Sequence, residues 1–180
     1  MADALRNPPP VATTPWLRRL DVSARFSFRG DPAARDRAGA VFGVALPEVA
    51  CRAVTAGARA ALWLGPDEQL LIAPAAEADA VRLAFASALA AVPHSLVDVS
   101  HRQLALELVG PRAAWLLNAG CPLDLDVASF PPGMCTRTVF HKAEIVLWRT
   151  GAEAFHLEVW RSFTDYVVGM LCEAARELGE

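Results

Sequence analysis

Apolar and polar positions in the first quarter of the chain change period at a run of turn residues. Residues 24–29, ARFSFR, predict a short strand. Asp31 and Pro32 then have the residue types of a helix N-cap and a first helical turn. Since Gly43 and Pro47 are residues that end helices, we expect the helix to run to about Gly43.

A hairpin and a second helix are predicted next. Residues 60–74, AALWLGPDEQLLIAP, are two apolar runs on either side of Gly65-Pro66-Asp67-Glu68, a turn sequence, and predict a β-hairpin. The period then changes to that of an amphipathic helix over residues 76–92, which Pro93 ends. Its predicted inward positions are Val81, Phe85, Ala88, Leu89 and Val92.

The second half repeats this order of elements. Alternation over residues 104–108 predicts a half-buried strand, and Gly110-Pro111 begins a helix that Gly120 and Pro122 end. Further strands are predicted at about 135–141, 144–149 and 154–160. A capping box at residues 162–165 opens the last helix. Its predicted inward residues are Phe163, Tyr166, Val167, Met170 and Leu171.

The two halves therefore predict a pseudo-repeat. An offset of 85 residues places Trp63 on Trp148, Val81 on Tyr166 and Phe85 on Met170. We predict an α+β fold of two strand-helix-hairpin-helix units, about 24–93 and 97–178, with mostly antiparallel sheet covered by helices. Residues 1–22 form an extended N-terminal arm in this scheme, and residues 23–180 a single domain.

Composition is that of a folded chain with no electrostatic preference for nucleic acid or anionic membrane. The 180 residues are 54% hydrophobic and 21% charged, with a net charge of -3. The N-terminus lacks the apolar stretch of a signal peptide, and no apolar run is long enough for a membrane-spanning helix. We expect a cytoplasmic protein whose four cysteines are reduced thiols.

Asp98, Ser100 and His101 are the residue types of a nucleophilic triad. In an extended segment, however, Asp98 and Ser100 point to one side and His101 to the other. We expect Asp98 and Ser100 to bond the backbone of a turn at the end of a strand instead.

Metal and cofactor sites have little support. Cys121, Cys135 and His141, with His101 as a fourth ligand, contain none of the close pairs that structural zinc uses. No dinucleotide-binding or Walker motif is present. We therefore assign no catalytic, metal-binding or cofactor-binding residue to this chain, and we interpret Cys135 and Cys172 as small buried residues.

Tryptophans on second faces suggest contacts with another protein. Trp115 lies off the apolar face of its helix, and Trp160 lies opposite Phe155, Leu157 and Val159. A partner chain and a two-sided buried sheet explain this pattern equally well. The candidate subunit-contact residues are Trp16, Asp98, Ser100, His101, Arg102, Trp115 and Trp160.

Four stretches resemble the gamma subunit of heterotetrameric sarcosine oxidase. They are WLGPDEQLLIAP, VDVSHRQLALELVGPRAAWLLNAGCPLDL, FPPGMCTRTVFHKAEIVLWR and FHLEVWRSFTDYVVGML, within residues 26–172. The runs GCPLDL, FPPGMC and RSF-x-D-Y are the most specific. More distantly, VDVSHR with Gly110-Pro111 is similar to the aminomethyltransferase T-protein, which implies the fold of the folate-binding domains of that superfamily.

This resemblance implies an accessory, non-catalytic subunit of an oxidoreductase. Its partners would be the alpha, beta and delta subunits, and FAD, FMN, NAD and tetrahydrofolate would be held by partner subunits. The complex would demethylate sarcosine to glycine, with hydrogen peroxide and a one-carbon unit as further products. A standalone folate-binding protein and a homo-oligomeric module without oxidase partners are the alternatives.

Overall fold

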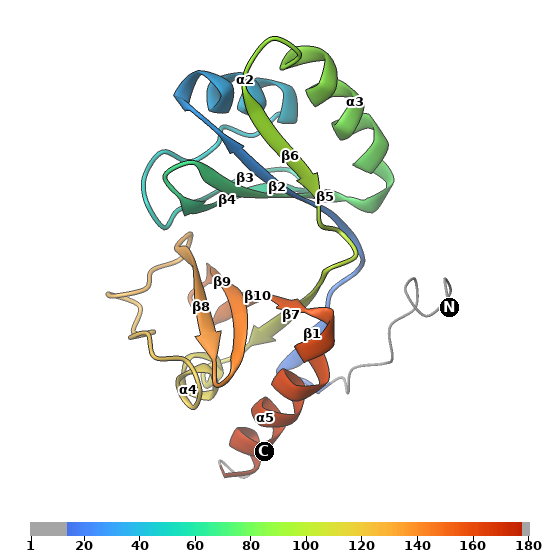
Figure 1. Cartoon of the computed structure of the whole chain (residues 1–180). Coiled ribbons are helices and arrows are strands. Elements are labelled where there is room, and N and C mark those ends of the chain that lie inside the picture. Colours follow the sequence, from blue (N-terminus) through green and yellow to red (C-terminus); the bar gives the residue numbers. More distant parts are fainter. Residues whose placement is uncertain (1–13, 178–180) are drawn as a thin grey trace, which may run out of the picture. The chain divides into compact units, whose positions relative to one another are not determined.

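The computed structural model describes residues 14–177, which separate into two compact units (Figure 1). Unit 1 contains the chain up to Asp21, His101–Pro132 and the chain from Arg137 onward. Unit 2 contains Val22–Ser100 and Gly133–Thr136. The N-terminal part of the predicted arm, residues 1–13, lies outside the described residues. Whether residues 23–180 behave as one domain stays a prediction.

Unit 2 is an antiparallel sheet of five strands in the order β3-β4-β5-β2-β6, with two helices. Its core lies between one sheet face and the helices, where Phe26, Phe28, Phe42 and Phe85 are fully buried. The elements are β2 (Ser23–Gly30), α2 (Pro32–Phe42), β3 (Ala53–Ala56), β4 (Arg59–Gly65), β5 (Glu68–Pro74), the 3-10 turn η1 (Ala75–Glu77), α3 (Ala78–Ala88) and β6 (His94–Asp98).

Helix α2 begins and ends where its sequence predicts. Asp31 Oδ1 accepts the backbone N–H of Ala34 at 2.8 Å, which satisfies one of the free donors of the first turn. Gly43 ends the helix in the left-handed region, at φ 74°, where a residue without Cβ is favoured.

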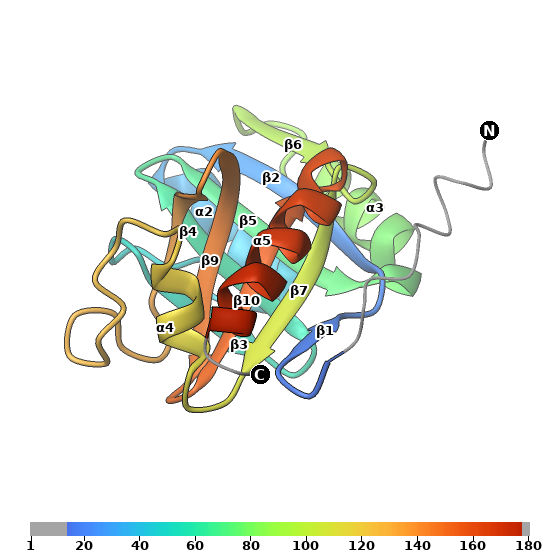
Figure 2. The same ribbon diagram turned by 90° about the horizontal axis from the view of Figure 1, so that it is seen from below.

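Unit 1 is a second five-stranded sheet, in the order β1-β7-β10-β9-β8, with its own two helices. Helix α5 lies over β10 and contacts α4 (Figure 2). The elements are β1 (Leu17–Arg19), β7 (Gln103–Val109), α4 (Ala113–Asn118), β8 (Cys135–Phe140), β9 (Ala143–Gly151), β10 (Ala154–Trp160), the 3-10 turn η2 (Arg161–Phe163) and α5 (Thr164–Glu177).

The prediction that residues 104–108 form a half-buried strand is wrong, because β7 is buried on both sides. Leu106 and Leu108 are inaccessible, and Gln103 and Ala105 on the alternate side are buried as well. The sequence alternation reflects two different buried environments, one apolar and one partly polar. It does not distinguish core from solvent here.

The pseudo-repeat extends to sheet topology. The order β6-β2-β5-β4-β3 in unit 2 matches β1-β7-β10-β9-β8 in unit 1, element for element. Strand β1 comes just before β2 along the chain but pairs with β7, and β6 comes just before β7 but pairs with β2. The strand that precedes β2 therefore pairs in the sheet of β7, and the strand that precedes β7 pairs in the sheet of β2. The predicted α+β class with antiparallel sheets is confirmed.

The residue correspondence between the repeats is 86 positions, one more than predicted. A shift of 86 carries β5 from 68–74 to β10 at 154–160 and η1 from 75–77 to η2 at 161–163. Val81 and Phe85 therefore correspond to Val167 and Leu171, all four buried. Trp63, which pairs with Gln69, corresponds to Arg149, which pairs with Phe155, and the expected match with Trp148 is wrong.

Two helix starts differ from the sequence prediction. Residues 75–77 and 161–163 form 3-10 turns before α3 and α5, and α3 ends at Ala88. The capping box predicted at residues 162–165 does not form, because Ser162 lies in the 3-10 turn and α5 begins only at Thr164. The Thr164 hydroxyl donates to the Trp160 carbonyl at 3.3 Å. Phe163 and Tyr166 are exposed, so their inward prediction is wrong.

No helix in the stretch 14–177 is long and apolar enough to cross a membrane.

Candidate functional site

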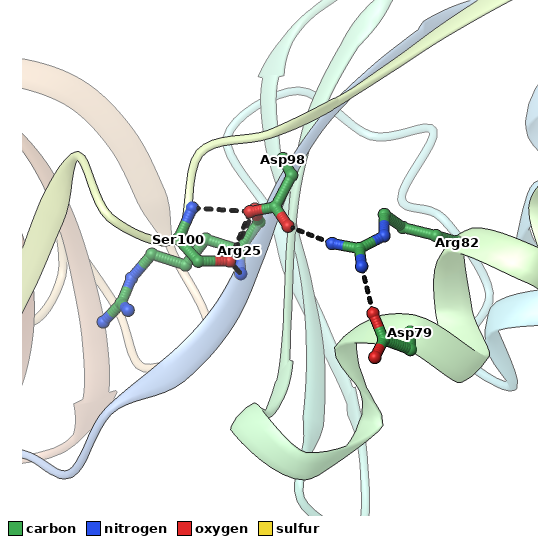
Figure 3. Close-up of polar contacts among 5 residues, drawn as sticks. All are labelled: Arg25, Asp79, Arg82, Asp98 and Ser100. Atoms are coloured by element: carbon green, nitrogen blue, oxygen red, sulfur yellow. Dashed lines mark hydrogen bonds and ion pairs between the residues drawn. The ribbon is translucent and has the colours of Figure 1, made fainter. Parts of the chain in front are cut away.

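The segment after β6 is a hydrogen-bonded turn (Figure 3). Ser100 donates both its backbone N–H, at 2.9 Å, and its hydroxyl, at 2.6 Å, to Asp98 Oδ1. The Ser100 hydroxyl oxygen also accepts the backbone N–H of Arg25 on β2 at 2.9 Å. The hydroxyl therefore joins the turn after β6 to strand β2, which agrees with the turn role that the sequence predicts for Asp98 and Ser100.

Asp98 also connects this turn to helix α3. Its second oxygen accepts from Arg82 Nη1 at 2.9 Å, and the same guanidinium bonds Asp79 on the first turn of the helix (Figure 3). Partial burial disfavours the ionised Asp98 carboxylate, but the hydrogen bonds from Ser100 and Arg82 outweigh it and lower its pKa.

Asp98→Asn is therefore expected to destabilise the chain at neutral pH and to reduce its acid sensitivity. A pKa that is lower in the folded state adds stability above the unfolded pKa, which is lost as pH falls through the folded value. We expect a loss of about 1 kcal/mol at pH 7, since Asp98 is partly exposed. Urea unfolding of both proteins at pH 7 and below pH 4 should show the difference shrinking with acid; an equal difference at both would contradict this role.

Unit 1 carries an exposed surface of arginines and aromatic rings, here called the arginine–aromatic surface. It consists of Arg102, Trp160, Arg161, Phe163 and Tyr166. The Arg102 guanidinium lies 5.0 Å from the Trp160 ring, and the Phe163 and Tyr166 rings meet edge to face at 6.4 Å. Trp160 is 38% exposed and Phe163 40%. Exposed rings beside arginines are typical of protein interfaces.

The same surface contains arginine N–H groups that the described chain leaves without a hydrogen-bond partner. Arg161 Nε donates to the His101 carbonyl at 3.1 Å, but its Nη1 is buried and unbonded, as is Nε of Arg102. Unpaired buried donors are costly, so a side-chain rotation that exposed them to a carboxylate of another molecule would be favourable. Three of the candidate contact residues, His101, Arg102 and Trp160, thus lie in one region of unit 1.

A second exposed tryptophan lies in a groove of about 550 Å³ in unit 1, here called the acidic groove. Trp115 is 50% exposed on α4 and faces a lining that includes Asp124, Asp126, Val127 and Glu153. Hydrogen bonds from the Ser129 hydroxyl and the Asp126 N–H lower the pKa of Asp124, so this carboxylate is ionised at neutral pH.

The buried guanidinium of Arg149 forms part of the groove wall and organises the surrounding loops. Its nitrogens donate to the carbonyls of Leu125 at 3.0 Å, Phe130 at 2.9 Å, Gly151 at 3.2 Å and Ala152. Arg149 also lies over the Phe155 ring at 4.8 Å. The sequence analysis did not identify Arg149. The one signal for it in the sequence is an Arg at a strand position directly after an apolar run.

The alternate face of β10 is buried and polar, apart from its end at Trp160. His156 Nε2 lies 2.8 Å from Glu158 Oε1, the Trp148 ring lies 5.5 Å from the imidazole, and Glu158 is inaccessible. His156 itself is buried, with 8% of its surface exposed. The two-sided buried sheet thus explains His156, and an exposed surface explains Trp160.

Three of the residues considered and rejected as metal ligands have separate roles. Cys135 Sγ donates to the Trp63 carbonyl at 3.6 Å in unit 2. Cys121 Sγ lies 3.9 Å from Thr138 Oγ1. His141 lies in a turn with φ 51°, and its imidazole ring leaves no space for a Cβ on Gly120. Among residues 14–177, no group of three or more His, Cys, Asp or Glu side chains is arranged to hold a metal ion.

The remaining candidates have contrasting environments. Trp16 is half-buried, and its carbonyl accepts the backbone N–H of Val109 at 2.9 Å, beside β1. The thiol of Cys135 is fully buried, as predicted, whereas Cys172 is only half-buried. The sequence also gave no indication of the acidic groove, because Asp124 and Asp126 lie in a loop without periodicity.

The fold belongs to a known structural class. The aminomethyltransferase T of the glycine cleavage system from Bartonella henselae matches 86% of this chain with a TM-score of 0.66, at 14% identity and over 44% of its own length. That likeness concerns the fold alone and agrees with the predicted relation to the T-protein.

Sequence similarity identifies the family. Residues 29–177 match the family model described as sarcosine oxidase, gamma subunit family, and the chain belongs to that family. The sarcosine oxidase subunit gamma of Corynebacterium sp. (strain P-1) is 33% identical over 93% of this chain and 83% of its own. A chain of the heterotetrameric sarcosine oxidase from Corynebacterium sp. U-96 matches with a TM-score of 0.84 and 31% identity, over 91% of this chain and 85% of its own.

Proposed function

We propose that this chain is the small gamma subunit of a heterotetrameric sarcosine oxidase and that it assembles with alpha, beta and delta subunits. The observation that carries the proposal is the structural match with a chain of such a heterotetramer over nearly the full length of both chains. It favours the oxidase subunit over a standalone folate-binding or homo-oligomeric module. A cytoplasmic location stays a prediction.

The assembled complex would demethylate sarcosine oxidatively to glycine. Oxygen would be reduced to hydrogen peroxide, and the one-carbon unit would pass to tetrahydrofolate or leave as formaldehyde. We infer that the partner subunits hold FAD, FMN, NAD and tetrahydrofolate. The role of this chain is then to bind its partners and support their arrangement, without a catalytic residue of its own.

The arginine–aromatic surface is the contact region that we favour. It combines exposed rings, which lose water on contact, with guanidinium N–H groups that lack a partner in the described chain. We propose that a partner subunit covers Trp160 and Phe163 and brings an Asp or Glu carboxylate to Arg102 and Arg161. Ion pairs of this kind are strongest when water is excluded around them.

The acidic groove is a second contact region, centred on Trp115. Its carboxylates, Asp124, Asp126 and Glu153, suit a partner segment that carries Lys or Arg, and the exposed indole suits the same cation. Of the other candidates, Asp98 and Ser100 have local bonds that hold the turn. A contact role for them, and for Trp16, stays a prediction.

Substitutions on the arginine–aromatic surface are expected to weaken assembly without unfolding the chain. Trp160→Ala and Arg102→Glu should each lower affinity for the partner subunits by about 30-fold, or about 2 kcal/mol, because each removes a contact near the centre of the surface. The measurement is binding of the purified variants to the alpha–beta–delta assembly by calorimetry.

Leu83→Ala is the matched control, because Leu83 is 72% exposed on α3 and lies outside both proposed regions. It should bind as the unmodified chain does. Equal affinity for all three variants would overturn the assignment of this surface. The broader function is tested by co-expression with the three partner chains: stoichiometric co-purification is expected, and a complete oxidase lacking this chain would contradict the proposal.

A further inference from the structure

Two cysteines in unit 2 lie opposite each other across an antiparallel bridge. Arg52 and Met134 are bridge partners, flanked by two backbone hydrogen bonds. Ala53 N–H donates to the Gly133 carbonyl at 2.8 Å, and Cys135 N–H donates to the Cys51 carbonyl at 3.0 Å. In this register the next facing pair is Cys51 and Cys135.

The register brings these residues within disulfide range. Facing residues joined by a backbone hydrogen bond in an antiparallel pair have Cα atoms about 5.5 Å apart. A disulfide needs Cα atoms about 4.4 to 6.8 Å apart, and the register places the pair within that range. Cys51 itself has a left-handed backbone, at φ 58°. Both cysteines are free thiols in this structure.

The two thiols differ in accessibility. Cys51 is half-buried in a turn, whereas Cys135 is fully buried with its Sγ on the Trp63 carbonyl. Burial raises the pKa of Cys135 to about 12, and the neighbouring Cys51 thiol adds to the effect. Cys135 is therefore protonated at neutral pH, and a soluble oxidant reaches Cys51 first.

We propose that Cys51 and Cys135 are an oxidation site at which hydrogen peroxide forms an intramolecular disulfide. The Cys51 thiolate attacks one peroxide oxygen, the O–O bond breaks, and water leaves after protonation of the departing hydroxide. The resulting Cys51 sulfenic acid is attacked by the Cys135 sulfur as it loses its proton, and a second water leaves. Two thiols are oxidised to one disulfide, and one peroxide is reduced to two waters.

The bond would attach the start of β8 covalently to the turn before β3. Cys135 is the first residue of β8, which forms one edge of its sheet, and β3 forms an edge of the other sheet. In the reduced chain, backbone hydrogen bonds join these segments without a covalent link. The inference concerns this chain alone and does not depend on its partner subunits.

The test is peroxide oxidation of the folded, reduced full chain, followed by alkylation and peptide mass spectrometry without reductant. We expect a linked pair of peptides containing Cys51 and Cys135, lighter by two hydrogens and released by dithiothreitol. Cys51→Ser and Cys135→Ala should abolish the link. Cys172→Ser should retain it, because Cys172 is a half-buried thiol on α5 that takes no part.

Cys135→Ala also tests the order of steps, because the Cys51 sulfenic acid should then accumulate and react with dimedone. Closure in the unmodified chain should speed up by roughly tenfold per pH unit near neutrality, since the reactive thiolate of Cys135 becomes more abundant. Oxidation of Cys51 with Cys135 still open to alkylation after unfolding would overturn the proposal. So would a link between Cys51 and Cys172.

Discussion

Arg149→Met is expected to lower the free energy of unfolding by about 3 to 5 kcal/mol. Methionine fills much of the same volume but donates nothing, so carbonyls that Arg149 now bonds lose their donor. The carbonyls of Leu125 and Phe130 suffer most, because their bonds to Nη1 are buried. The measurement is urea unfolding of the purified chain at constant pH.

Arg137→Met is the control for this change. Arg137 lies on β8 with a partly exposed side chain, and its ion pair with Glu144 is long, at 3.8 Å. Such surface pairs contribute about 1 kcal/mol or less, so this variant should stay near the unmodified chain. Similar losses for Arg137→Met and Arg149→Met would show that the buried hydrogen bonds of Arg149 are not the cause of the lost stability.

The buried pair on β10 is expected to give the second large effect. His156→Leu should cost about 3 kcal/mol, because it removes the imidazole from a carboxylate that is inaccessible to water. His156→Leu combined with Glu158→Leu should cost less than this single change, because the double variant also removes the buried carboxylate. Urea unfolding of the unmodified chain, His156→Leu, Glu158→Leu and the double variant measures the coupling; additive losses would exclude an interaction between the two side chains.

Local sequence rules predicted the elements whose determinants are local. Asp31, Pro32 and Gly43 lie within one helix, and the turn at residues 65–68 separates two strands that pair with each other. Strands β1 and β3 were not predicted, and of β6 only its end at Asp98 was. Each is short, and β1 and β6 are stabilised by pairing with strands of the other repeat, which no short window of sequence reveals.

The one-residue error in the repeat offset had consequences for the site. It matched Trp63 with Trp148 because both residues are tryptophan. The strand register matches Trp63 with Arg149 instead. The error also matched the buried Val81 with the exposed Tyr166, although Val167 is the buried residue that corresponds to Val81. Residue identity misled the alignment, whereas backbone pairing defines it.

The candidate contacts were predictable only where exposure followed from helix or strand geometry. Trp115 and Trp160 lie on the sides opposite to their apolar neighbours and are exposed, which decides between the two explanations that the sequence left open. The acidic groove depends on Asp124 and Asp126 in a loop that Arg149 fixes from a distant strand. The spacing of residues along the chain does not predict a hydrogen bond between such distant positions.

The three residues of β1 have a consequence for solubility. Leu17–Arg19 pair with Leu106–Leu108, so the outer side of β7 is occupied by a strand of the same chain. Without β1, the backbone groups of this apolar strand would be open to pairing with a second molecule, which is a common route to aggregation. Strand β1 thus helps to prevent the sheet of unit 1 from pairing with a strand of another molecule.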